Sequence, residues 1–318
     1  TKEGRGANEI PALQVVAHLS MAAAAKLFTD VDVKLDAIYA AAGADKPLPH
    51  VPLNLSARLE RNSTRGSTSS SNVVGMVQGS DPKLKNEYVI FSAHLDHLGI
   101  RPGMTGDTIM NGAMDNAAGV ATLLEMARMI SAMPVKPKRS ILFLAVTGEE
   151  KGLMGSDYFA TYPTVPAASM VANVNLDMPV LTYDFSNVIA FGANRSTLKS
   201  AAANAAKKLN VALIPDPWPD QSVFTRTDHY NFVRQGVPAI YFIPGIRSFN
   251  KNENAGAMYD EFLQTHYHKP SDDMNVPINW RAAERFANLN YLLGIEIAND
   301  PQRIRWNKGD FFGDLFKR

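Results

Sequence analysis

The chain has 318 residues, 46% of them hydrophobic, which is enough to bury the core of one large α/β domain or of two smaller ones. Lys and Arg number 32 against 31 Asp and Glu, so the broad charged surface that nucleic acid or an acidic membrane requires is not expected. There is no cysteine, which excludes disulfides and thiolate nucleophiles and leaves only His and carboxylates as zinc ligands.

Three features of the first quarter of the chain stand out. Apolar residues recur at helical spacing from Ile10 to Phe28, and Met21 to Phe28 predicts a helix. Ser63 to Asn72 is rich in Ser, Thr and Gly, which is typical of a hairpin tip or a crossover loop. Thr1 to Asn8 is polar and lacks the apolar core of a signal peptide, and no run of roughly 18 to 20 apolar residues predicts a membrane span.

The middle of the chain repeats a short apolar run, a polar loop and a helical stretch, which is the pattern of a parallel α/β sheet. The predicted strands are Tyr88 to Ala93, Ser140 to Val146, Met170 to Leu176, Asn187 to Phe191 and Pro238 to Ile243. The predicted covering helices are Ala117 to Ser131, Ser196 to Leu209 and Asn279 to Ala298. The sequence therefore predicts a three-layer α/β fold.

Charged residues follow three of the predicted strands at the point where each strand ends. His94 and Asp96 follow the first of these strands, Glu149 and Glu150 the second, and Asp177 the third. Because open parallel sheets bind ligands outside the carboxyl ends of their strands, we expect the chemistry of the protein at these positions.

His94 and Asp96 are separated by one residue, so they project to the same side of an extended strand end. The Asp96 carboxylate is placed to accept the second ring N–H of His94, which would fix the tautomer of a metal-ligating imidazole. The alternative is a surface His beside a surface Asp.

Asp115 lies in a turn of small residues that opens onto a helix, and its alternative role is that of an ordinary helix N-cap.

Glu149 and Glu150 are neighbours at a strand end, where consecutive side chains point in different directions. One carboxylate can therefore bind metal while the other faces substrate, although a solvated loop pair is the alternative. Two anions side by side on an apolar strand end repel and are costly to desolvate, so the pair favours a bound cation.

Asp177 directly follows an apolar strand, where an unpaired buried carboxylate is costly. Capping of the next turn is its alternative role.

His266 and His268 alternate before Pro270, and only one of them is needed as a ligand. The candidate donors are then two imidazoles and three carboxylates, with one further carboxylate left free. Oxygen and nitrogen donors without sulfur suit Zn²⁺, with Co²⁺ or Mn²⁺ as substitutes, in a catalytic site that keeps open positions for water. If five residues serve two metals about 3.5 to 4 Å apart, one carboxylate must bridge them.

Five segments are recognisable together: Ala93-His-Leu-Asp-His-Leu-Gly99, Met114-Asp-Asn-Ala-Ala-Gly119, Thr147-Gly-Glu-Glu-Lys-Gly-Leu-Met-Gly-Ser156, Asn175-Leu-Asp177 and Tyr267-His-Lys-Pro-Ser-Asp272. In order and spacing they resemble the motifs of the di-zinc aminopeptidase family, the bacterial leucyl aminopeptidase-like zinc exopeptidases related to glutamate carboxypeptidase and glutaminyl cyclase. The resemblance extends from about Asn72 to about Ala298. It implies a three-layer α/β/α sandwich around a mixed, mainly parallel central sheet.

The resemblance also implies the roles of the metal ligands. His94 and Asp177 would hold one zinc ion, Glu150 and His268 would hold the other, and Asp115 would bridge the two.

Three further residues complete the implied catalytic set. Glu149 takes the position of the general base, which accepts a proton from the attacking water and returns it to the leaving amine. Tyr267 matches a tyrosine that stabilises the developing oxyanion in some relatives. Asp96 is expected to support His94 as described above.

Other residues are expected to stay outside the ligand set. Asp228 and His229 resemble another family signature, in which the Asp lies in the wall of the site without binding metal. No family ligand aligns with His97, so we expect a partly exposed loop histidine there. His18 and His50 lie far from any motif and are expected to be structural or solvated.

The resemblance bears on the organisation of the chain as well. Residues 1–70 are expected to form an N-terminal segment of helix and strands that packs on a catalytic domain of residues 71–318. Many exported relatives carry a protease-associated domain near the N-terminus, and this chain lacks it, so we expect a truncated or processed front. We therefore expect a periplasmic or extracellular protein whose signal peptide has been removed.

The implied function is hydrolysis of the N-terminal peptide bond of peptides with a free N-terminus. A glutaminyl cyclase usually holds one zinc and often has Trp before its last histidine, where this chain has Tyr267. A carboxypeptidase would need arginines for the substrate carboxylate, for which Arg226 and Arg247 are candidates. A non-catalytic scaffold on the same fold is disfavoured because all five ligands and Glu149 are present.

Substrate preference and oligomeric state have no clear signal in the sequence. Met178, Phe242, Ile243 and Phe249 are candidates for the substrate pocket, with core packing as their alternative role. The aromatic tail from Phe311 to Phe316 is expected to cover the domain's own core.

Overall fold

The computed structural model describes residues 15–64 and 66–316, which fall into two compact units divided after Thr68. The first unit contains α1 (Met21–Leu27) and α2 (Leu35–Gly43), so the predicted helix at Met21 to Phe28 is confirmed. The hydroxyl of Ser20 accepts a hydrogen bond from the backbone N–H of Ala23 and caps the start of α1. Neither helix has a buried residue. The described residues of 46–72 form neither helix nor strand, so no hairpin flanks the Ser-rich stretch.

The second unit is built on a sheet whose described strands run in the order β1-β5-β2-β6-β9-β7-β8. These strands are β1 (Val73–Val77), β2 (Tyr88–His94), β5 (Ser140–Val146), β6 (Met170–Asn175), β7 (Asn187–Phe191), β8 (Ala212–Ile214) and β9 (Ala239–Pro244). β5, β2, β6 and β9 are parallel neighbours, whereas β1 runs antiparallel to β5 and β7 antiparallel to β9. A separate ribbon pairs β3 (Gly99–Ile100) with β4 (Ile109–Met110).

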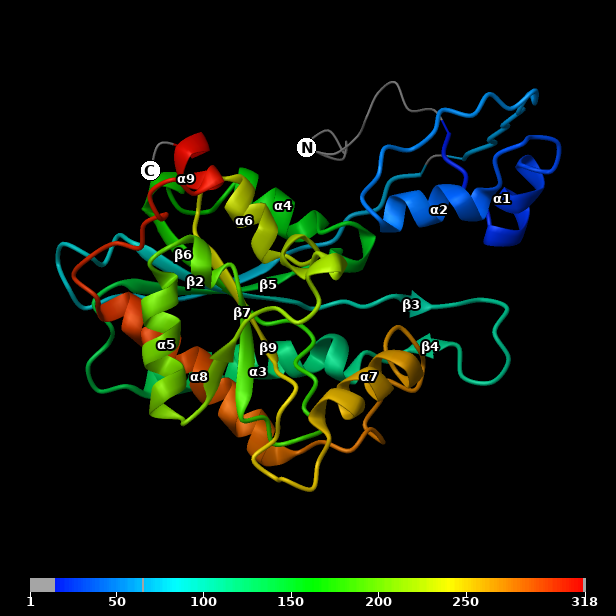
Figure 1. Cartoon of the computed structure of the whole chain (residues 1–318). Helices are drawn as coiled ribbons and strands as arrows, with labels where there is room; N and C mark the ends of the chain where they lie inside the picture. The colour runs from blue at the N-terminus through cyan, green and yellow to red at the C-terminus, as the bar shows by residue number, and fades with distance from the viewer. Residues whose placement is uncertain (1–14, 65, 317–318) are drawn as a thin grey trace. The chain divides into compact units, whose positions relative to one another are not determined.

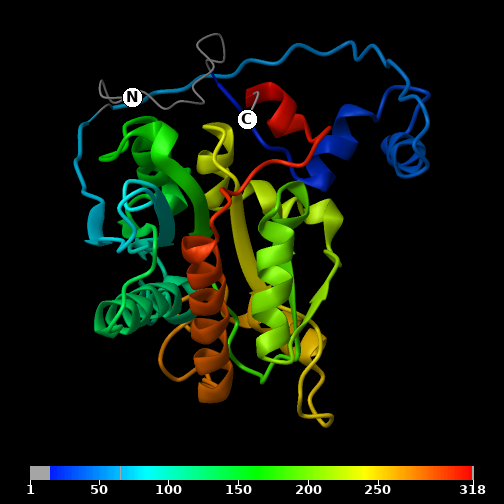
Figure 2. The same ribbon diagram turned by 90° about the vertical axis from the view of Figure 1, so that its left-hand side faces the viewer.

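Helices cover both faces of this sheet (Figures 1 and 2). They are α3 (Ala118–Ala132), α4 (Met154–Thr161), α5 (Leu198–Lys208), α6 (His229–Arg234), α7 (Ala255–Thr265), α8 (Trp280–Asn299) and α9 (Phe311–Phe316). Buried residues of α3, α5 and α8 share one core cluster, and those of α4 and α6 share another. The predicted α/β/α sandwich with a mixed, mainly parallel sheet is therefore confirmed.

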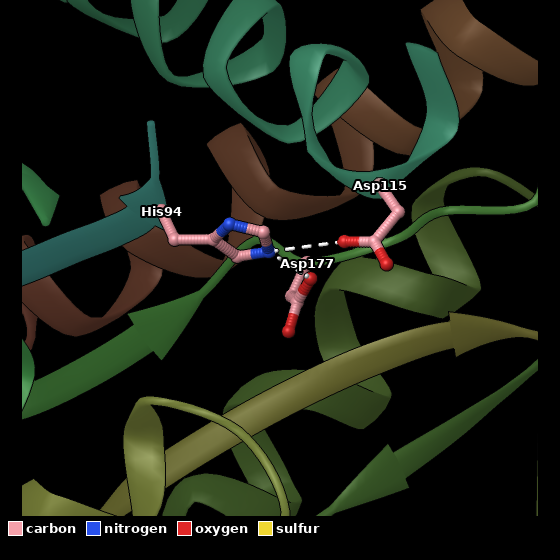
Figure 3. Close-up of side chains that lie close together, drawn as sticks. All are labelled: His94, Asp115 and Asp177. Atoms are coloured by element: carbon pink, nitrogen blue, oxygen red, sulfur yellow. Dashed lines mark hydrogen bonds and ion pairs between the residues drawn. The ribbon is translucent and has the colours of Figure 1, made fainter. Parts of the chain in front are cut away.

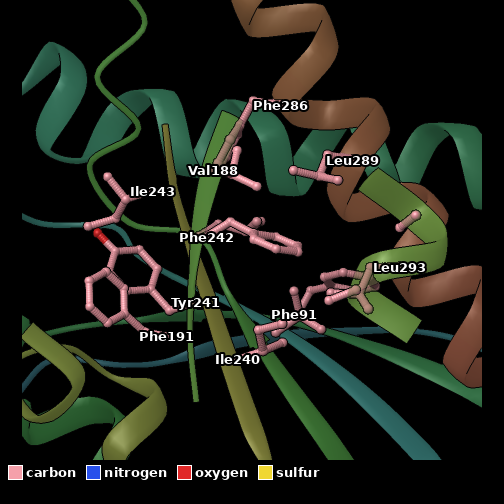
Figure 4. Close-up of a cluster of buried hydrophobic side chains, with 14 of the residues drawn as sticks. Phe91, Val188, Phe191, Ile240, Tyr241, Phe242, Ile243, Phe286, Leu289 and Leu293 are labelled. Atoms are coloured by element: carbon pink, nitrogen blue, oxygen red, sulfur yellow. The ribbon is translucent and has the colours of Figure 1, made fainter. Parts of the chain in front are cut away.

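The two clusters are separated by the alternation of side chains along each central strand. In β2, Val89 and Phe91 belong to the cluster with α3 and α8, whereas Ile90 between them belongs to the cluster with α4 and α6. Figure 4 shows part of the first cluster, which contains Phe91 together with Phe286, Leu289 and Leu293 of α8. Gly294 of α8 allows this approach, because a Cβ there would lie 2.1 Å from the ring of Phe91. Burial on both faces explains why the central strands are continuous apolar runs.

The predicted strands and covering helices lie within two residues of the observed ones. β1 was not predicted, although its sequence Val-Val-Gly-Met-Val is apolar; it is a strand at the edge of the sheet, and its side chains are mostly exposed. The aromatic tail covers its own domain as expected: Phe312 packs against Trp306, with ring centroids 5.6 Å apart. No described helix is both long enough and apolar enough to cross a bilayer.

Arg139 connects the start of β5 to the end of α8. Its side chain is 1% exposed, and its Nε donates to Glu87 Oε2 at 2.6 Å. Its Nη1 donates to the backbone carbonyls of Ile297, at 3.0 Å, and of Asp300. The buried guanidinium thus satisfies carbonyls that the end of the helix leaves without a partner.

Replacement of Arg139 by Met should lower the free energy of unfolding by about 3 kcal/mol, because Glu87 and two carbonyls lose a buried partner. Urea unfolding followed by circular dichroism measures this change. The matched control is Arg128→Met, which breaks a pair whose Arg side chain is 70% exposed and should leave stability nearly unchanged. Equal losses in both variants would contradict the assigned role of Arg139.

Candidate metal centre

Three neighbouring parallel strands bring the candidate residues to one edge of the sheet. His94, the last residue of β2, is in register with Val146 at the end of β5, and Ser92 is in register with Asn175 at the end of β6. Glu149 and Glu150 follow β5 in a short 3-10 turn, and Asp177 follows β6. The chain reaches this turn through Gly148, which has a φ of 67°. The structure thus brings these charged residues together at the carboxyl ends of the strands, as predicted.

Asp115 reaches the same place from the turn that precedes α3. Its backbone is not helical (φ −115°, ψ 83°), and the peptide bond from Asp115 to Asn116 is cis. The backbone N–H groups of Met114 and Asp115 donate to the Asp272 carboxylate at 2.9 and 3.0 Å. Asp272 is fully buried and lies four residues after His268, so it connects the Asp115 turn to the loop of the last histidine.

The Asp115 carboxylate divides its two oxygens between two histidines. Its Oδ1 lies 3.1 Å from His94 Nε2, and its Oδ2 lies 3.3 Å from His268 Nε2. His94 Nε2 also lies 3.0 Å from Asp177 Oδ1 (Figure 3), and His268 Nε2 lies 3.3 Å from Glu150 Oε2. The five residues thus form two groups that share Asp115.

The donor atoms and their spacing fit zinc. Bonds of about 2.0 to 2.1 Å to a tetrahedral zinc ion place neighbouring donor atoms about 3.3 Å apart. The four contacts in the two groups, from 3.0 to 3.3 Å, are close to this value. His94, Asp115 and Asp177 each offer a donor atom within 4.8 Å of the others, as do His97, Asp115 and Glu150. Imidazole nitrogen and carboxylate oxygen without sulfur suit a catalytic zinc site.

The charges in the site are strongly coupled. Burial would raise the pKa of Asp115, but hydrogen bonds with His268 and His94 hold it below its usual range. Hydrogen bonds to Asp115 and Glu150 raise the pKa of His268 to about 9. Burial lowers the pKa of His94, but the neighbouring Asp177 and Asp115 raise it well above its usual value. Protons on the imidazoles therefore balance the carboxylates where cations would otherwise do so.

Glu149 has no such compensation. Its burial, together with the charges of Asp177 and Asp228, raises its pKa to about 10. A carboxyl group that holds a proton in a site rich in anions becomes a better acceptor when cations arrive, because they favour its ionised form. Glu149 thus differs from Glu150, whose pKa is held to about 2 by hydrogen bonds with His268 and His97 against the effect of burial.

The prediction that the Asp96 carboxylate accepts a hydrogen bond from His94 is wrong. His94 Nδ1 lies 2.9 Å from the backbone carbonyl of Asp96, which orients the ring instead. The Asp96 carboxylate accepts hydrogen bonds from the Gly148 backbone N–H, at 2.8 and 3.0 Å, and from the Thr147 hydroxyl. The Gly148 N–H and the Thr147 hydroxyl, which follow the neighbouring strand β5, thus bind the Asp96 carboxylate in place of His94. Asp96 therefore positions the turn that carries Glu149 and Glu150.

The helix-capping alternative for Asp115 is also wrong, because Asn116 has that role. Asn116 Oδ1 accepts from the Gly119 N–H at 3.1 Å and from the Met178 N–H at 3.1 Å, and its Nδ2 donates to the Leu176 carbonyl at 2.9 Å. A Cβ at Gly119 would lie 2.1 Å from Asn116 Oδ1, so only glycine fits there. The roles of Asn116 and Asp272 were not predicted, because most of their contacts join segments that are far apart in the chain.

His97 lies in a loop and is partly exposed as a whole residue, as expected, but its side chain turns towards the site. The His97 side chain is 7% exposed, and its Nδ1 lies 2.7 Å from Glu150 Oε1. His266, in contrast, faces away from the carboxylates, with its Nδ1 2.7 Å from the Ser271 carbonyl. Of the two alternating histidines, His268 is therefore the one that joins the site.

Asp228 and His229 are fully buried at the start of α6. Burial raises the pKa of Asp228 to about 7 and lowers that of His229 to about 3. Neither side chain belongs to the two groups of donor atoms found in the described residues. The charge of Asp228 acts on Glu149.

The sequence places this site in a known family. A profile of peptidase family M28 matches residues 72–293, which is more than two thirds of the chain. The chain belongs to peptidase family M28. Asp115 and the residues around it, from His94 to His268, lie inside the matched region.

Several individual proteins of this kind are similar to the chain. A probable zinc metalloprotease of Pyrenophora teres f. teres is 36% identical over 107 residues, which are 33% of this chain and 22% of that protein. Aminopeptidase NAALADL1 of Mus musculus is 31% identical over 201 residues, which are 61% of this chain and 23% of that protein. The matched part is thus less than a quarter of the length of either curated relative.

Solved structures of the M28 fold agree with the architecture. A peptidase M28 precursor from Shewanella amazonensis has a TM-score of 0.53 at 26% identity, with 76% of this chain and 47% of that chain covered. A zinc aminopeptidase from Bacillus subtilis has a TM-score of 0.54 at 22% identity, with 72% of this chain and 50% of that chain covered.

A cavity opens onto the M28 site. It is lined by the carboxylates of Asp115, Glu149, Glu150 and Asp177, by Tyr267 and His268, and by a largely apolar wall that includes Met178, Val223, Ile243, Tyr259 and Leu263. Two of the pocket candidates, Met178 and Ile243, therefore line it. Phe242 is part of the core instead, and Phe249 packs against Arg285 at 4.4 Å. Arg226 lines the cavity, whereas Arg247 is not part of its wall.

Replacement of Glu149 by Gln should alter how the stability of the metal-free protein depends on pH. Glu149 has a folded pKa of about 10, above the 4.5 of an unperturbed Glu. Its contribution to stability is therefore complete below pH 4.5 and is lost as the pH rises towards 10. The stability of Glu149→Gln relative to the wild type should increase by up to about 1.4 kcal/mol per pH unit in this window. Urea unfolding in the presence of a chelator, at a series of pH values, measures the effect, and parallel curves would contradict it.

Proposed function

We propose that this chain is a two-zinc aminopeptidase that removes the N-terminal residue from peptides. The observation that carries the proposal is the division of the Asp115 carboxylate between His94 and His268, with Oδ1 3.1 Å from one imidazole and Oδ2 3.3 Å from the other. A carboxylate with one oxygen in each of two donor groups is what a bridging ligand requires. Membership of peptidase family M28 supports the reaction class.

In the proposed centre, His94 and Asp177 hold one zinc ion, Glu150 and His268 hold the other, and Asp115 serves both. Co²⁺ or Mn²⁺ would serve as substitutes, since the same donors suit them. Two zinc ions there would lower the pKa of water and polarise the scissile carbonyl.

Glu149 is the proposed general base. It is the one of the two adjacent glutamates that remains outside the two donor groups of the described residues, and it lines the cavity. Its carboxylate accepts the proton of the attacking water and returns it to the leaving amine. Tyr267 lines the same cavity and is proposed to donate its hydroxyl to the developing oxyanion. Asp96 contributes by positioning the Thr147–Gly148 turn, through which Glu149 is held.

The proposed substrate is a peptide with a free N-terminal amine. Met178, Ile243 and Leu263 line the cavity and suit an apolar side chain. The similar mouse protein is described as an aminopeptidase. We further propose that residues 71–318 are the catalytic domain and that the protein works outside the cytoplasm. The similar Shewanella protein is described as a precursor.

Two neighbouring substitutions should separate proton transfer from metal binding. Glu149→Gln should keep two zinc ions per chain and lose nearly all turnover, a loss of about 100-fold or more, because only the proton shuttle is removed. Glu150→Ala should instead bind one of the two zinc ions much more weakly. Zinc content by atomic absorption and turnover of leucine 4-nitroanilide measure the two effects. Near-normal turnover in the first variant, or unchanged zinc content in the second, would refute the assigned roles.

One observation favours a carboxypeptidase as a second candidate. Arg226 lines the cavity and forms no ion pair with any described residue, so its guanidinium is free to receive a substrate carboxylate. A dipeptide series distinguishes the candidates. For an aminopeptidase, N-acetylation should abolish hydrolysis and C-terminal amidation should leave it within a few-fold. The opposite pattern would replace the aminopeptidase proposal by the carboxypeptidase.

A further inference from the structure

His97 is the one imidazole of the site that the proposed ligand set does not use. It lies in the loop after β2, three residues beyond His94, and only 7% of its side chain is exposed. Its ring lies edge-on to that of His268, with centroids 5.5 Å apart. Gly112 faces it closely, since a Cβ there would lie 3.0 Å from His97 Cγ. The ring is therefore held against the site from two sides.

The contacts of His97 differ from those of the proposed ligands. Its Nδ1 lies 2.7 Å from Glu150 Oε1 and 3.9 Å from Asp115 Oδ2. The first distance is well below, and the second well above, the separation of about 3.3 Å expected between two donor atoms of one tetrahedral zinc ion. A separation of 2.7 Å is instead that of a hydrogen bond to a carboxylate. His97 thus fits a partner of a ligand better than a ligand.

The two oxygens of Glu150 face different imidazoles. Oε2 lies 3.3 Å from His268 Nε2, in one of the two proposed zinc groups, and Oε1 lies 2.7 Å from His97 Nδ1. Oε1 and both His97 nitrogens are buried, and no described group forms a hydrogen bond of regular geometry with any of them. The 2.7 Å contact between Oε1 and Nδ1 is therefore the interaction through which both groups can be satisfied. Without His97, Glu150 Oε1 would be buried without a polar group beside it, and the carboxylate would be free to rotate.

We propose that His97 is a positioning residue for the second zinc site: its Nδ1–H donates to Glu150 Oε1 and thereby fixes Glu150 Oε2 towards the metal shared with His268. Hydrogen bonds to ligating carboxylates orient them, and loss of such a partner typically weakens metal binding about 10- to 100-fold. In the first site, His94 and Asp177 form no ion pair with His97 among the described residues, and the shared Asp115 lies 3.9 Å from its Nδ1, so this site should be little affected. The inference rests on the proposed two-zinc centre.

The test measures zinc affinity by competition with a chromophoric chelator, on the full chain after removal of metal. His97→Phe keeps the ring volume and removes the donor, so it should weaken one of the two zinc sites about 10- to 100-fold and leave the other within twofold. His97→Asn retains an N–H close to the position of Nδ1 and should restore most of the affinity. The matched control is His266→Phe, since that imidazole contacts the Ser271 carbonyl and not a carboxylate. It should keep both affinities within twofold.

Three outcomes would overturn the inference. The first is unchanged affinity of both zinc sites in His97→Phe. The second is an equal loss in His97→Phe and His97→Asn, which would assign the effect to packing. The third comes from protein loaded with Co²⁺: a change of coordination number in the visible spectrum of His97→Asn would make His97 a ligand.

Turnover separates this inference from the proposed function. At limiting zinc, His97→Phe should lose kcat with little change in KM, and excess zinc should restore kcat. Wild-type protein that binds no zinc would refute the two-zinc centre itself. Wild-type protein that binds two zinc ions, beside a variant that binds both equally well, would refute only the role of His97.

Discussion

Mutual repulsion among carboxylates is the constraint on which this structure depends. Asp115, Glu149, Glu150 and Asp177 line one cavity at the end of a parallel sheet, where burial removes most of the water that would screen them. In the metal-free chain, the cost is met by protons, as the raised pKa values of Glu149, His94 and His268 indicate. A pair of divalent cations at the same place would replace those protons. The fold is thus organised to hold an arrangement of charge that is unfavourable without a ligand.

The supporting contacts have a common design. Each acidic side chain is held by groups that belong to a different strand end or loop: Thr227 donates to Asp177, Asp272 accepts from the backbone of the Asp115 turn, and Asp96 accepts from Gly148. Backbone N–H groups supply many of these bonds, and they have little freedom to move. The geometry of the site therefore comes from the rigid scaffold more than from the side chains that carry the chemistry.

Much of the fold was predictable because the central strands are buried on both faces. Ser140 to Val146 is a continuous apolar run for this reason, and its predicted bounds are those of β5. The edge strand β1 was missed: its run of Val73 to Val77 is apolar but short, is interrupted by Gly75, and is mostly exposed. For the site, the rule that ligands gather at the carboxyl ends of parallel strands located His94, Glu150 and Asp177 without knowledge of the structure.

Contacts between distant segments were not predictable. Spacing alone placed the Asp96 carboxylate against His94, two residues away, whereas it bonds to the Thr147–Gly148 turn, about 50 residues further along the chain. His97 likewise has no sequence signal that would direct it to Glu150, because the two residues lie more than 50 positions apart in the chain. Local patterns thus identify which residues carry charge, and the tertiary structure decides which of them meet.

The Asp272 contact has a consequence for biosynthesis. Its carboxylate receives the backbone of Met114 and Asp115, which lie more than 150 residues earlier in the chain. A nascent polypeptide on the ribosome therefore contains His94 and Asp115 well before it contains the carboxylate that orders the Asp115 turn. The Asp115 turn can therefore take its final form only after residue 272 has been synthesised, late in the growth of the chain.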